Sequence, residues 1–249
     1  MIDTHAHVFL CKTPLEEILE NARQAGVTHM ANVALDLASA KSVLALSKTY
    51  PQLIPTIGLY PSEAEKPYSL QDLRILLEAG GFKAIGEIGL DFLKNYATKE
   101  KQSALFEGQL QLALDFDLPV LIHNRQADIE MIETFRKFPT VKKVFHCFSS
   151  PLSFANTMLS INSETYFSFG GLITYDPDEA YLETIRTIPL ERMMIETDCP
   201  YLTPTTLKGR ENQPAYVVEI AKKIAEIKQV SLREVDDITS ENARQFFGI

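Results

Sequence analysis

The sequence has few of the features that mark exported, membrane-spanning or disulfide-bonded proteins. Its three cysteines are too few and too scattered for a disulfide framework or a CxxC zinc site. No segment approaches the roughly 18 uninterrupted apolar residues that a membrane-spanning helix needs. The first residues also lack the basic and apolar regions of a signal peptide. We therefore expect a cytoplasmic protein that contacts no membrane.

Positive charge is also in short supply. The chain has 24 lysines and arginines against 33 aspartates and glutamates, which gives a formal net charge of −9. Proteins that cover a phosphate backbone non-specifically carry an excess of basic residues. Any nucleic-acid substrate must therefore be held by a few local groups.

Short apolar runs rich in β-formers recur along the 249 residues, with amphipathic stretches between them. The eight runs are Met1–Thr4, Thr28–Val33, Leu53–Ile57, Ala84–Ile88, Pro119–Ile122, Val141–Phe145, Thr165–Phe169 and Arg192–Glu196. Eight β/α units in a chain of this length predict an α/β protein with one (β/α)₈ TIM-barrel domain over residues 1–249. In such barrels the active-site residues lie at the C-terminal ends of the strands.

Two segments have the pattern of a helix start. Thr13-Pro-Leu-Glu16 combines a hydroxyl for capping, a proline at the first helical position and a glutamate three residues after the cap. Ser231-Leu-Arg-Glu234 has the same hydroxyl and glutamate spacing. We expect helices to begin directly after Thr13 and Ser231.

Four of the five histidines stand at the end of a predicted strand or just beyond it. His5 and His7 are two residues apart on an extended segment, so their side chains project to the same side. A single strand-end histidine is more often structural than a metal ligand, and His29, at the start of its run, is interpreted as structural. Together with two acidic groups, however, the histidines predict one metal centre at one rim of the barrel. Its predicted ligands are His5, His7, Glu87, His123, His146 and Asp198.

Six nitrogen and oxygen donors exceed what one tetrahedral ion can use, so the set predicts two divalent ions that share a carboxylate. Imidazole and carboxylate without thiolate suit Zn, Mn, Ni or Fe, and leave Mg possible. Two such ions can deprotonate a bridging water and polarise a phosphoryl or carbonyl oxygen. Hydrolysis is the expected reaction.

Five spaced elements contain the predicted ligands: Asp3-Thr-His-Ala-His7, Gly86-Glu-Ile-Gly-Leu-Asp91, Leu121-Ile-His123, His146-Cys-Phe-Ser149 and Ile195-Glu-Thr-Asp-Cys-Pro-Tyr-Leu-Thr-Pro204. In these elements the sequence resembles the TatD family of metal-dependent hydrolases. Their order and spacing run across essentially the whole chain, from Ile2 to the segment Asn242–Gly248.

The resemblance implies a barrel with deoxyribonuclease activity, commonly 3′ to 5′ on single-stranded DNA ends, that requires divalent metal. It assigns His5, His7 and Asp198 to one metal. It assigns His123 and His146 to the other, with Glu87 shared. Asp198 would also be the base on the attacking water, so Glu87 and Asp198 are the expected catalytic residues. We expect a monomer whose partner is DNA.

Substrate contacts are expected from Tyr60, Arg125, Arg210 and Asn212. Tyr60 stands where many relatives carry a histidine, which replaces a cationic phosphate contact with a phenol. Arg210-Glu-Asn-Gln-Pro214 resembles the family's Arg-Asn-Glu-Pro loop, with charges altered by Glu211 and Gln213.

Several neighbouring residues have two interpretations. Asp91 either orients a metal-binding imidazole or caps the next helix. Glu196 is expected to hydrogen-bond a ligand rather than bind metal directly. Aromatic side chains at 145, 148, 167 and 169 could stack a base, but barrel packing is favoured for most of them. Cys147 and Cys199 are expected to be ordinary buried thiols.

Two other functions compete with the nuclease. The same metals could attack a carbonyl, as in an esterase or amidohydrolase such as a D-aminoacyl-tRNA deacylase, an activity also associated with TatD-like proteins. A catalytically silent binding protein is the other alternative. The complete donor set argues against it, because binding alone does not require all six groups.

Overall fold

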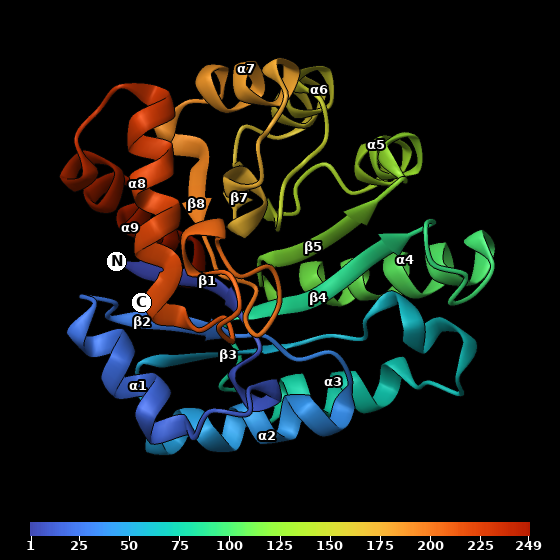
Figure 1. Ribbon diagram of the computed structural model, residues 1–249. Coiled ribbons are helices and arrows are strands. Elements are labelled where there is room, and N and C mark those ends of the chain that lie inside the picture. Colours follow the sequence, from blue (N-terminus) through green and yellow to red (C-terminus); the bar gives the residue numbers. More distant parts are fainter. The chain divides into compact units, whose positions relative to one another are not determined.

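The computed structural model describes residues 1–249 and contains eight parallel strands in sequence order, with helices between them (Figure 1). The strands are β1 (Ile2–Ala6), β2 (His29–Asn32), β3 (Leu53–Ile57), β4 (Ala84–Asp91), β5 (Val120–Arg125), β6 (Lys143–Phe145), β7 (Thr165–Phe169) and β8 (Met193–Ile195). The helices are α1 (Leu15–Gln24), α2 (Leu37–Thr49), α3 (Leu70–Glu78), α4 (Lys99–Phe116), α5 (Asp128–Lys137), α6 (Leu152–Ile161), α7 (Glu179–Thr187), α8 (Val217–Lys228) and α9 (Leu232–Phe247). None of these helices combines the length and the apolar character that a bilayer span requires. The predicted (β/α)₈ fold class is confirmed.

The predicted strand ends differ from the observed ones where polar ligand residues occur. β3 and β7 have the predicted bounds, but β4 continues to Asp91 and β5 continues to Arg125. The ladder between β4 and β5 pairs Gly89 with His123, so both strands are still hydrogen-bonded beyond their apolar runs. His123 therefore lies inside a strand rather than after it, and Glu87 lies in the middle of β4 rather than near its end.

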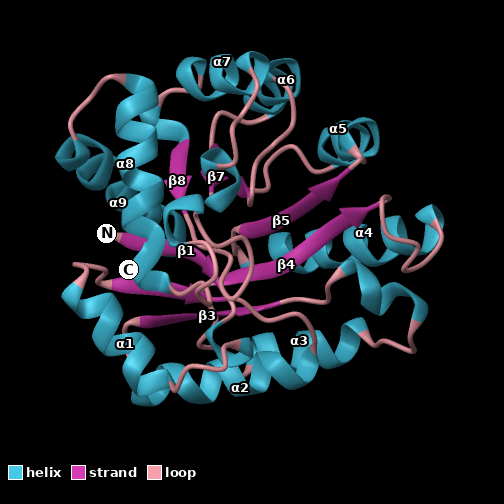
Figure 2. Cartoon of the chain, in the orientation of Figure 1, coloured by secondary structure: helices cyan, strands magenta, loops and turns pink.

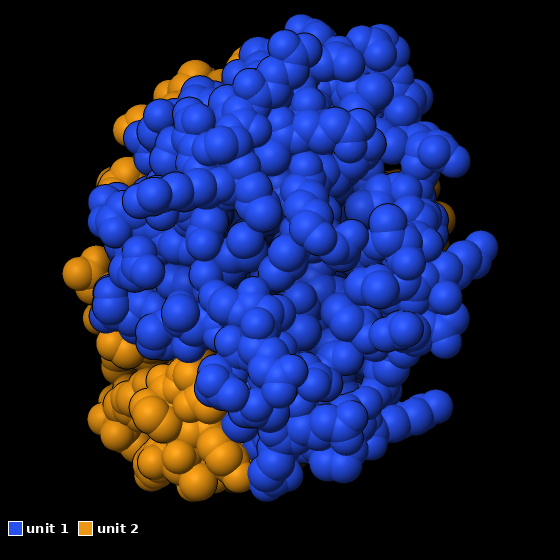
Figure 3. Space-filling view, turned by 60° about the vertical axis from the view of Figure 1, so that its left-hand side comes forward, with its two compact units in different colours: residues 1–32, 146–155, 166–249 blue, residues 33–145, 156–165 orange.

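The chain forms two compact units (Figure 3). Unit 1 comprises residues 1–32, 146–155 and 166–249. Unit 2 comprises residues 33–145 and 156–165.

In unit 1, β1 pairs with β2 and β7 pairs with β8, both in parallel. The buried Thr4 hydroxyl, on β1, lies 2.9 Å from the Ser168 hydroxyl and donates to the Ile195 carbonyl at 3.0 Å. α8 runs alongside β8 (Figure 1), and the Asn242 amide of α9 donates to the carbonyls of Leu190 and Met193. The segment between β8 and α8 is mostly loop (Figure 2). These contacts fix the ends of β1 and β8, near which the predicted ligands His5, His7 and Asp198 lie.

In unit 2, strands β3 to β6 are parallel neighbours in sequence order. Two buried glutamines of α4 hold the chain at the strand ends. Gln109 accepts from the Leu59 amide at 2.7 Å and donates to the Leu59 carbonyl at 3.0 Å. Gln102 does the same for Asp91, at 2.9 and 3.0 Å. A buried side-chain amide costs little free energy when both its NH₂ and its carbonyl are hydrogen-bonded, and these bonds fix the backbone.

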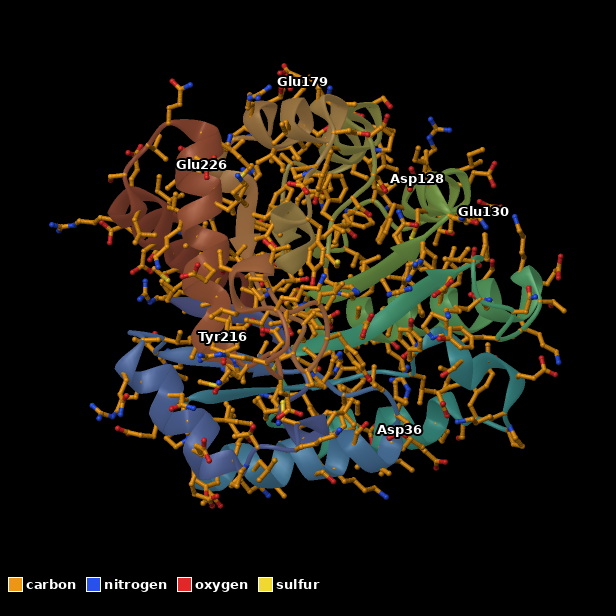
Figure 4. All side chains as sticks on the ribbon, in the orientation of Figure 1. Asp36, Asp128, Glu130, Glu179, Tyr216 and Glu226 are labelled. Carbon is orange, nitrogen blue, oxygen red and sulfur yellow. The ribbon has the colours of Figure 1, made fainter.

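One predicted helix start is confirmed and the other is wrong. The Ser231 hydroxyl accepts from the Glu234 amide at the start of α9. α1 begins at Leu15, one residue later than predicted, and is preceded by Pro14 without a side-chain cap. The Thr13 hydroxyl donates to the distant Glu211 carboxylate at 2.8 Å. α2 has a full capping box at Asp36, which is labelled in Figure 4.

Candidate metal centre

Unit 1 brings four of the six predicted ligands together. His5 Nε2 lies 3.3 Å from His7 Nε2, and Asp198 Oδ1 lies 3.9 Å from the first nitrogen and 3.5 Å from the second. The His146 ring stacks on the His5 ring with centroids 4.1 Å apart. One donor atom from each of His5, His146 and Asp198 falls within 4.8 Å of the others. Imidazole and carboxylate donors thus converge on one small volume.

The single carboxylate of this cluster is ionised at neutral pH. Burial alone would raise the pKa of Asp198. The hydrogen bond with His7 and the charges of His146, His5 and His7 outweigh burial and hold the pKa of Asp198 below its ordinary value. Asp198 is therefore present as an anion, the form in which a carboxylate binds metal or accepts a proton.

Asp3 links the segment that carries His5 to the segment that carries Asp198. Its carboxylate accepts from the amide of Thr197 at 3.0 Å, from the Thr197 hydroxyl at 2.5 Å and from the amide of His5 at 3.2 Å. The side chain is fully buried, and burial raises the pKa of Asp3 to about 8 against the opposing effect of these hydrogen bonds. Asp3 thereby joins the strand that carries His5 to the residue before Asp198.

Backbone bonds hold the Asp198 turn against β1. The Asp198 amide donates to the His5 carbonyl at 2.8 Å, and the His7 amide donates to the Cys199 carbonyl at 2.8 Å. Asp198 has a φ of 57°, in the left-handed region that a turn imposed by its surroundings can stabilise. The buried Asn212 amide donates to the carbonyls of Thr197 and Tyr201 on the same turn.

Glu196 contacts the cluster through His146. Its Oε1 lies 3.4 Å from His146 Nδ1 and accepts from the Cys147 amide at 2.6 Å. Glu196 is fully buried, and an added Cβ on Gly170 would lie 3.3 Å from its Cγ. The carboxylate is thus placed to orient the His146 imidazole, as acids beside metal-binding histidines commonly do.

Unit 2 brings together the other two predicted ligands, with two further polar side chains. Glu87 Oε1 lies 2.9 Å from His123 Nδ1, while Asp91 Oδ2 lies 3.2 Å from His123 Nε2. The Tyr60 hydroxyl lies 3.3 Å from the same Nε2. A Cβ on Gly89, whose φ is 145°, would lie 2.0 Å from the His123 carbonyl, so this crossing requires glycine. One imidazole therefore stands between two carboxylates and a phenol.

Asp91 contacts the His123 imidazole, as one interpretation expected, but it does not cap the next helix, because Thr98 is the cap of α4. Its Oδ2 faces His123, and its Oδ1 accepts from the amides of Leu93 and Lys94 at the following turn. Burial raises the pKa of Asp91. The hydrogen bonds with His123 and with the two amides lower it by more, so the pKa of Asp91 lies below its ordinary value. Burial, with the nearby charge of Glu87, raises the pKa of Tyr60 far above its ordinary value, so this phenol stays protonated.

The residues in both units fit divalent metal by their chemistry. Two imidazole nitrogens 3.3 Å apart, with a carboxylate oxygen 3.5 Å from one of them, are a donor set that a cation would satisfy. No cysteine thiol is among the groups that could hold a metal ion in either unit. The groups are therefore placed to bind metal through nitrogen and oxygen.

The predicted substrate residues have unlike surroundings. Arg125 and Arg210 are exposed, and Tyr60 is partly buried beside His123. Asn212 is fully buried, and its amide group is used to hold the Asp198 turn. We therefore assign Asn212 a positioning role that its place in the sequence did not reveal.

Aromatic packing separates the predicted core from an exposed ring. Four phenylalanines are buried, as the packing interpretation expected: Phe145, Phe148, Phe167 and Phe169. Tyr201 is 52% exposed and its ring lies edge-on to His7, with centroids 6.4 Å apart. Tyr201 lies in the motif Ile195–Pro204, and no role was expected for it. The available signal was an aromatic residue three positions after the predicted ligand Asp198.

The comparison with family models decides the classification, because the model described as TatD related DNase matches residues 2–248. The chain belongs to the TatD family. It is 33% identical to the uncharacterized metal-dependent hydrolase YabD of Bacillus subtilis, over 100% of this chain and 99% of that protein. It is 33% identical to the 3′-5′ ssDNA/RNA exonuclease TatD of Edwardsiella piscicida, over 93% of this chain and 92% of that protein. These relatives identify the chain as a metal-dependent hydrolase.

Solved structures of the family have the same fold. The TatD homologue YjjV of Escherichia coli K12 matches with a TM-score of 0.93 and 29% identity, over 100% of this chain and 98% of that one. A TatD family hydrolase from Entamoeba histolytica matches with a TM-score of 0.88 at 23% identity, over 99% and 97% of the two chains. The (β/α)₈ barrel is therefore the fold of this member of the family too.

Proposed function

We propose that the protein is a metal-dependent deoxyribonuclease that removes nucleotides in the 3′ to 5′ direction from single-stranded DNA ends. The observation that carries the proposal is the convergence of His5, His7 and Asp198 in unit 1. The family model and the exonuclease name of the Edwardsiella relative support the choice of substrate.

The proposed centre holds two divalent ions. His5, His7 and Asp198 would hold one, His123 and His146 the other, with Glu87 shared between them. The pairing of His123 with Glu87 at 2.9 Å supports their assignment to a common ion. When bound, such ions activate water for attack and polarise a phosphoryl oxygen.

Asp198 would receive the proton of the attacking water. Its pKa is held below the ordinary value, so the carboxylate is free of a proton before the reaction begins. The turn that carries it is fixed by Asn212 and by the backbone bond to His5, which keeps the oxygen in place. Glu196 would orient His146 during the same step.

Two exposed arginines and one phenol would contact the substrate. Arg125 and Arg210 can each bind phosphate oxygens through the guanidinium fork. Tyr60 is a protonated phenol beside His123, and it can donate a hydrogen bond to a phosphate or leaving oxygen. With a net charge of −9, a short single-stranded end suits these few contacts better than a duplex.

We further propose that residues 1–249 act as one catalytic domain and as a monomer in the cytoplasm. The end-to-end match to YabD, over 100% of this chain, supports a single functional domain. Light scattering on the purified protein tests the monomer, since a dimer would give twice the 28.0 kDa mass of one chain.

The decisive experiment is a cleavage assay with a single-stranded oligonucleotide labelled at its 5′ end. We expect a ladder of shortened labelled products, loss of all cleavage on chelation, and recovery with at least one of Mg, Mn, Zn and Ni. Asp198→Asn is the matched inactive control. D-aminoacyl-tRNA is assayed with the same preparation. Deacylation without any DNA cleavage would overturn the nuclease assignment in favour of an esterase.

A further inference from the structure

We propose that Tyr201 is a stacking platform for the base of the terminal nucleotide, a role that rests on the proposed nuclease function and specifies how its substrate is held. The ring is 52% exposed, although a tyrosine side chain buries favourably wherever the fold allows it. It stands edge-on to His7, at an interplanar angle of 71°. A large aromatic left open beside a metal ligand is therefore placed for a substrate rather than for the core.

Hydrogen bonds hold the Tyr201 backbone in place. The Tyr201 amide donates to the Asp198 carbonyl at 2.9 Å, and the Tyr201 carbonyl accepts from the buried Asn212 amide. The residue is thus held at both backbone groups by the turn that carries the proposed catalytic carboxylate. A platform fixed in this way loses little conformational freedom when a substrate binds.

Two other large side chains on the loops of unit 1 are exposed as well. Leu202 is 36% exposed and Tyr175 is 42% exposed, and the Tyr175 hydroxyl donates to the Thr203 carbonyl at 2.5 Å. Gly171 lets the two segments approach, since a Cβ there would lie 1.8 Å from the Leu202 carbonyl oxygen. Tyr175, Tyr201 and Leu202 are thus exposed on loops of unit 1 that are joined through the Thr203 and Leu202 backbone, and we call these three side chains the tyrosine platform.

The chemistry of the occupant follows from its surroundings. Asp198 and His7 belong to the proposed phosphate-cleaving centre, so the group beside them must be joined to a phosphodiester. The flat apolar part of a nucleotide is its base, and every base presents a face that can stack on tyrosine. The phenylalanines at 145, 148, 167 and 169 are buried and cannot serve. The platform thus favours a terminal nucleotide of any base, without sequence preference.

The test compares two 5′-labelled oligonucleotides that differ only in the 3′-terminal nucleotide, which is normal in one and abasic in the other. We expect the wild type to cleave the normal end with a kcat/KM about tenfold to a hundredfold higher, the range that one base stacked on an aromatic contributes. Tyr201→Ala and Tyr201→Leu should bring this ratio close to one. Tyr201→Phe, which keeps the ring, should preserve it.

A binding measurement separates failure of the platform from failure of the nuclease. Calorimetry of the metal-loaded protein compares deoxyadenosine monophosphate with deoxyribose 5-phosphate. If the wild type cleaves neither oligonucleotide yet binds the nucleotide about tenfold more tightly, and Tyr201→Ala loses that preference, the nuclease proposal fails and the platform stands. Equal binding of the two ligands by the wild type, or a preference that survives Tyr201→Ala, overturns the platform.

Discussion

The two units present the same kinds of predicted ligand in different proportions. In unit 1, His5, His7 and His146 lie around the Asp198 carboxylate, and Glu196 contacts only His146. In unit 2, the single imidazole of His123 lies against two carboxylates, those of Glu87 and Asp91. An imidazolium satisfies the second arrangement without metal, whereas three close imidazoles cannot all be protonated without repulsion. The imidazole cluster is therefore the part that depends more on a bound cation.

The largest effect should come from removing the Asp198 carboxylate from the imidazole cluster. We expect Asp198→Asn to lower kcat by about a thousandfold or more, because it removes both a ligand and the proposed proton acceptor. Glu87→Gln should cost about a hundredfold, since His123 keeps Asp91 as a partner.

Steady-state rates on single-stranded DNA measure both variants, and circular dichroism checks that each one folds. If either variant retained a rate within tenfold of the wild type, the role assigned to that residue would be wrong. An equal loss in both would instead contradict the contrast between the two clusters.

The next prediction concerns the second acid of unit 2. Asp91→Asn should weaken metal binding by about tenfold to a hundredfold, as removal of an acid that orients a metal-binding histidine commonly does. Calorimetric titration with metal measures the change. Asp72→Asn, on the exposed side of α3, is the matched control and should bind as the wild type does. Unchanged affinity in Asp91→Asn would show that this carboxylate only shapes the turn at Leu93 and Lys94.

The strand pattern was readable from the sequence because parallel strands are buried on both faces. β3 and β7 have the predicted bounds, since their apolar runs end where the strands end. β4 and β5 continue three residues further, because the ladder still pairs Gly89 with His123 and Asp91 with Arg125. An apolar run cannot show a strand that continues through buried polar residues with partners elsewhere.

Contacts between distant residues account for what the sequence did not reveal. Glu211, noted only as a change of loop charge, accepts from the amides of Lys12 and Thr13 and from the Thr13 hydroxyl, and so fixes the segment before α1. Asn212 was expected at the substrate and instead fastens the Asp198 turn. The partner of Glu211 is 199 residues away along the chain, and that of Asn212 is 15 residues away. Local sequence patterns do not specify such partners.

A buried lysine, Lys143, is another feature that the sequence did not reveal. No acid lies beside its charge. Lys143 begins β6, donates to the Val141 carbonyl at 3.0 Å and stands 4.5 Å from the centroid of the Phe135 ring. Burial lowers the pKa of Lys143 to about 8 from the ordinary 10.5. The folded state thus favours the neutral amine, and stability should rise as pH increases from about 8 to 10.5.

We expect Lys143→Met to raise the free energy of unfolding at pH 7 by about 1–3 kcal/mol and to remove this rise with pH. Urea unfolding at pH 7 and at pH 10 measures both quantities. A variant that is less stable at pH 7, or that keeps the pH dependence, would show that the ammonium has a favourable partner in the folded state.

The two units also differ in how their buried amide side chains are paired, and this difference should have the smallest effect. Gln102 and Gln109 of unit 2 bond the backbone with both of their groups. Asn32 of unit 1 ends β2 in register with Ala6, is fully buried, and has no partner for either amide atom. A buried amide without a partner costs free energy, so a side chain of similar size without polar atoms should be tolerated or preferred there.

Asn32→Leu should therefore raise the free energy of unfolding of the metal-free protein by about 1 kcal/mol. Gln109→Leu, the matched change in unit 2, should lower it by about 1–3 kcal/mol because the Leu59 amide and carbonyl lose their partners. Urea unfolding of both variants in the presence of chelator gives the two values side by side. Loss of stability in Asn32→Leu would mean that an ordered water satisfies this amide, and the contrast between the units would then rest on their charges alone.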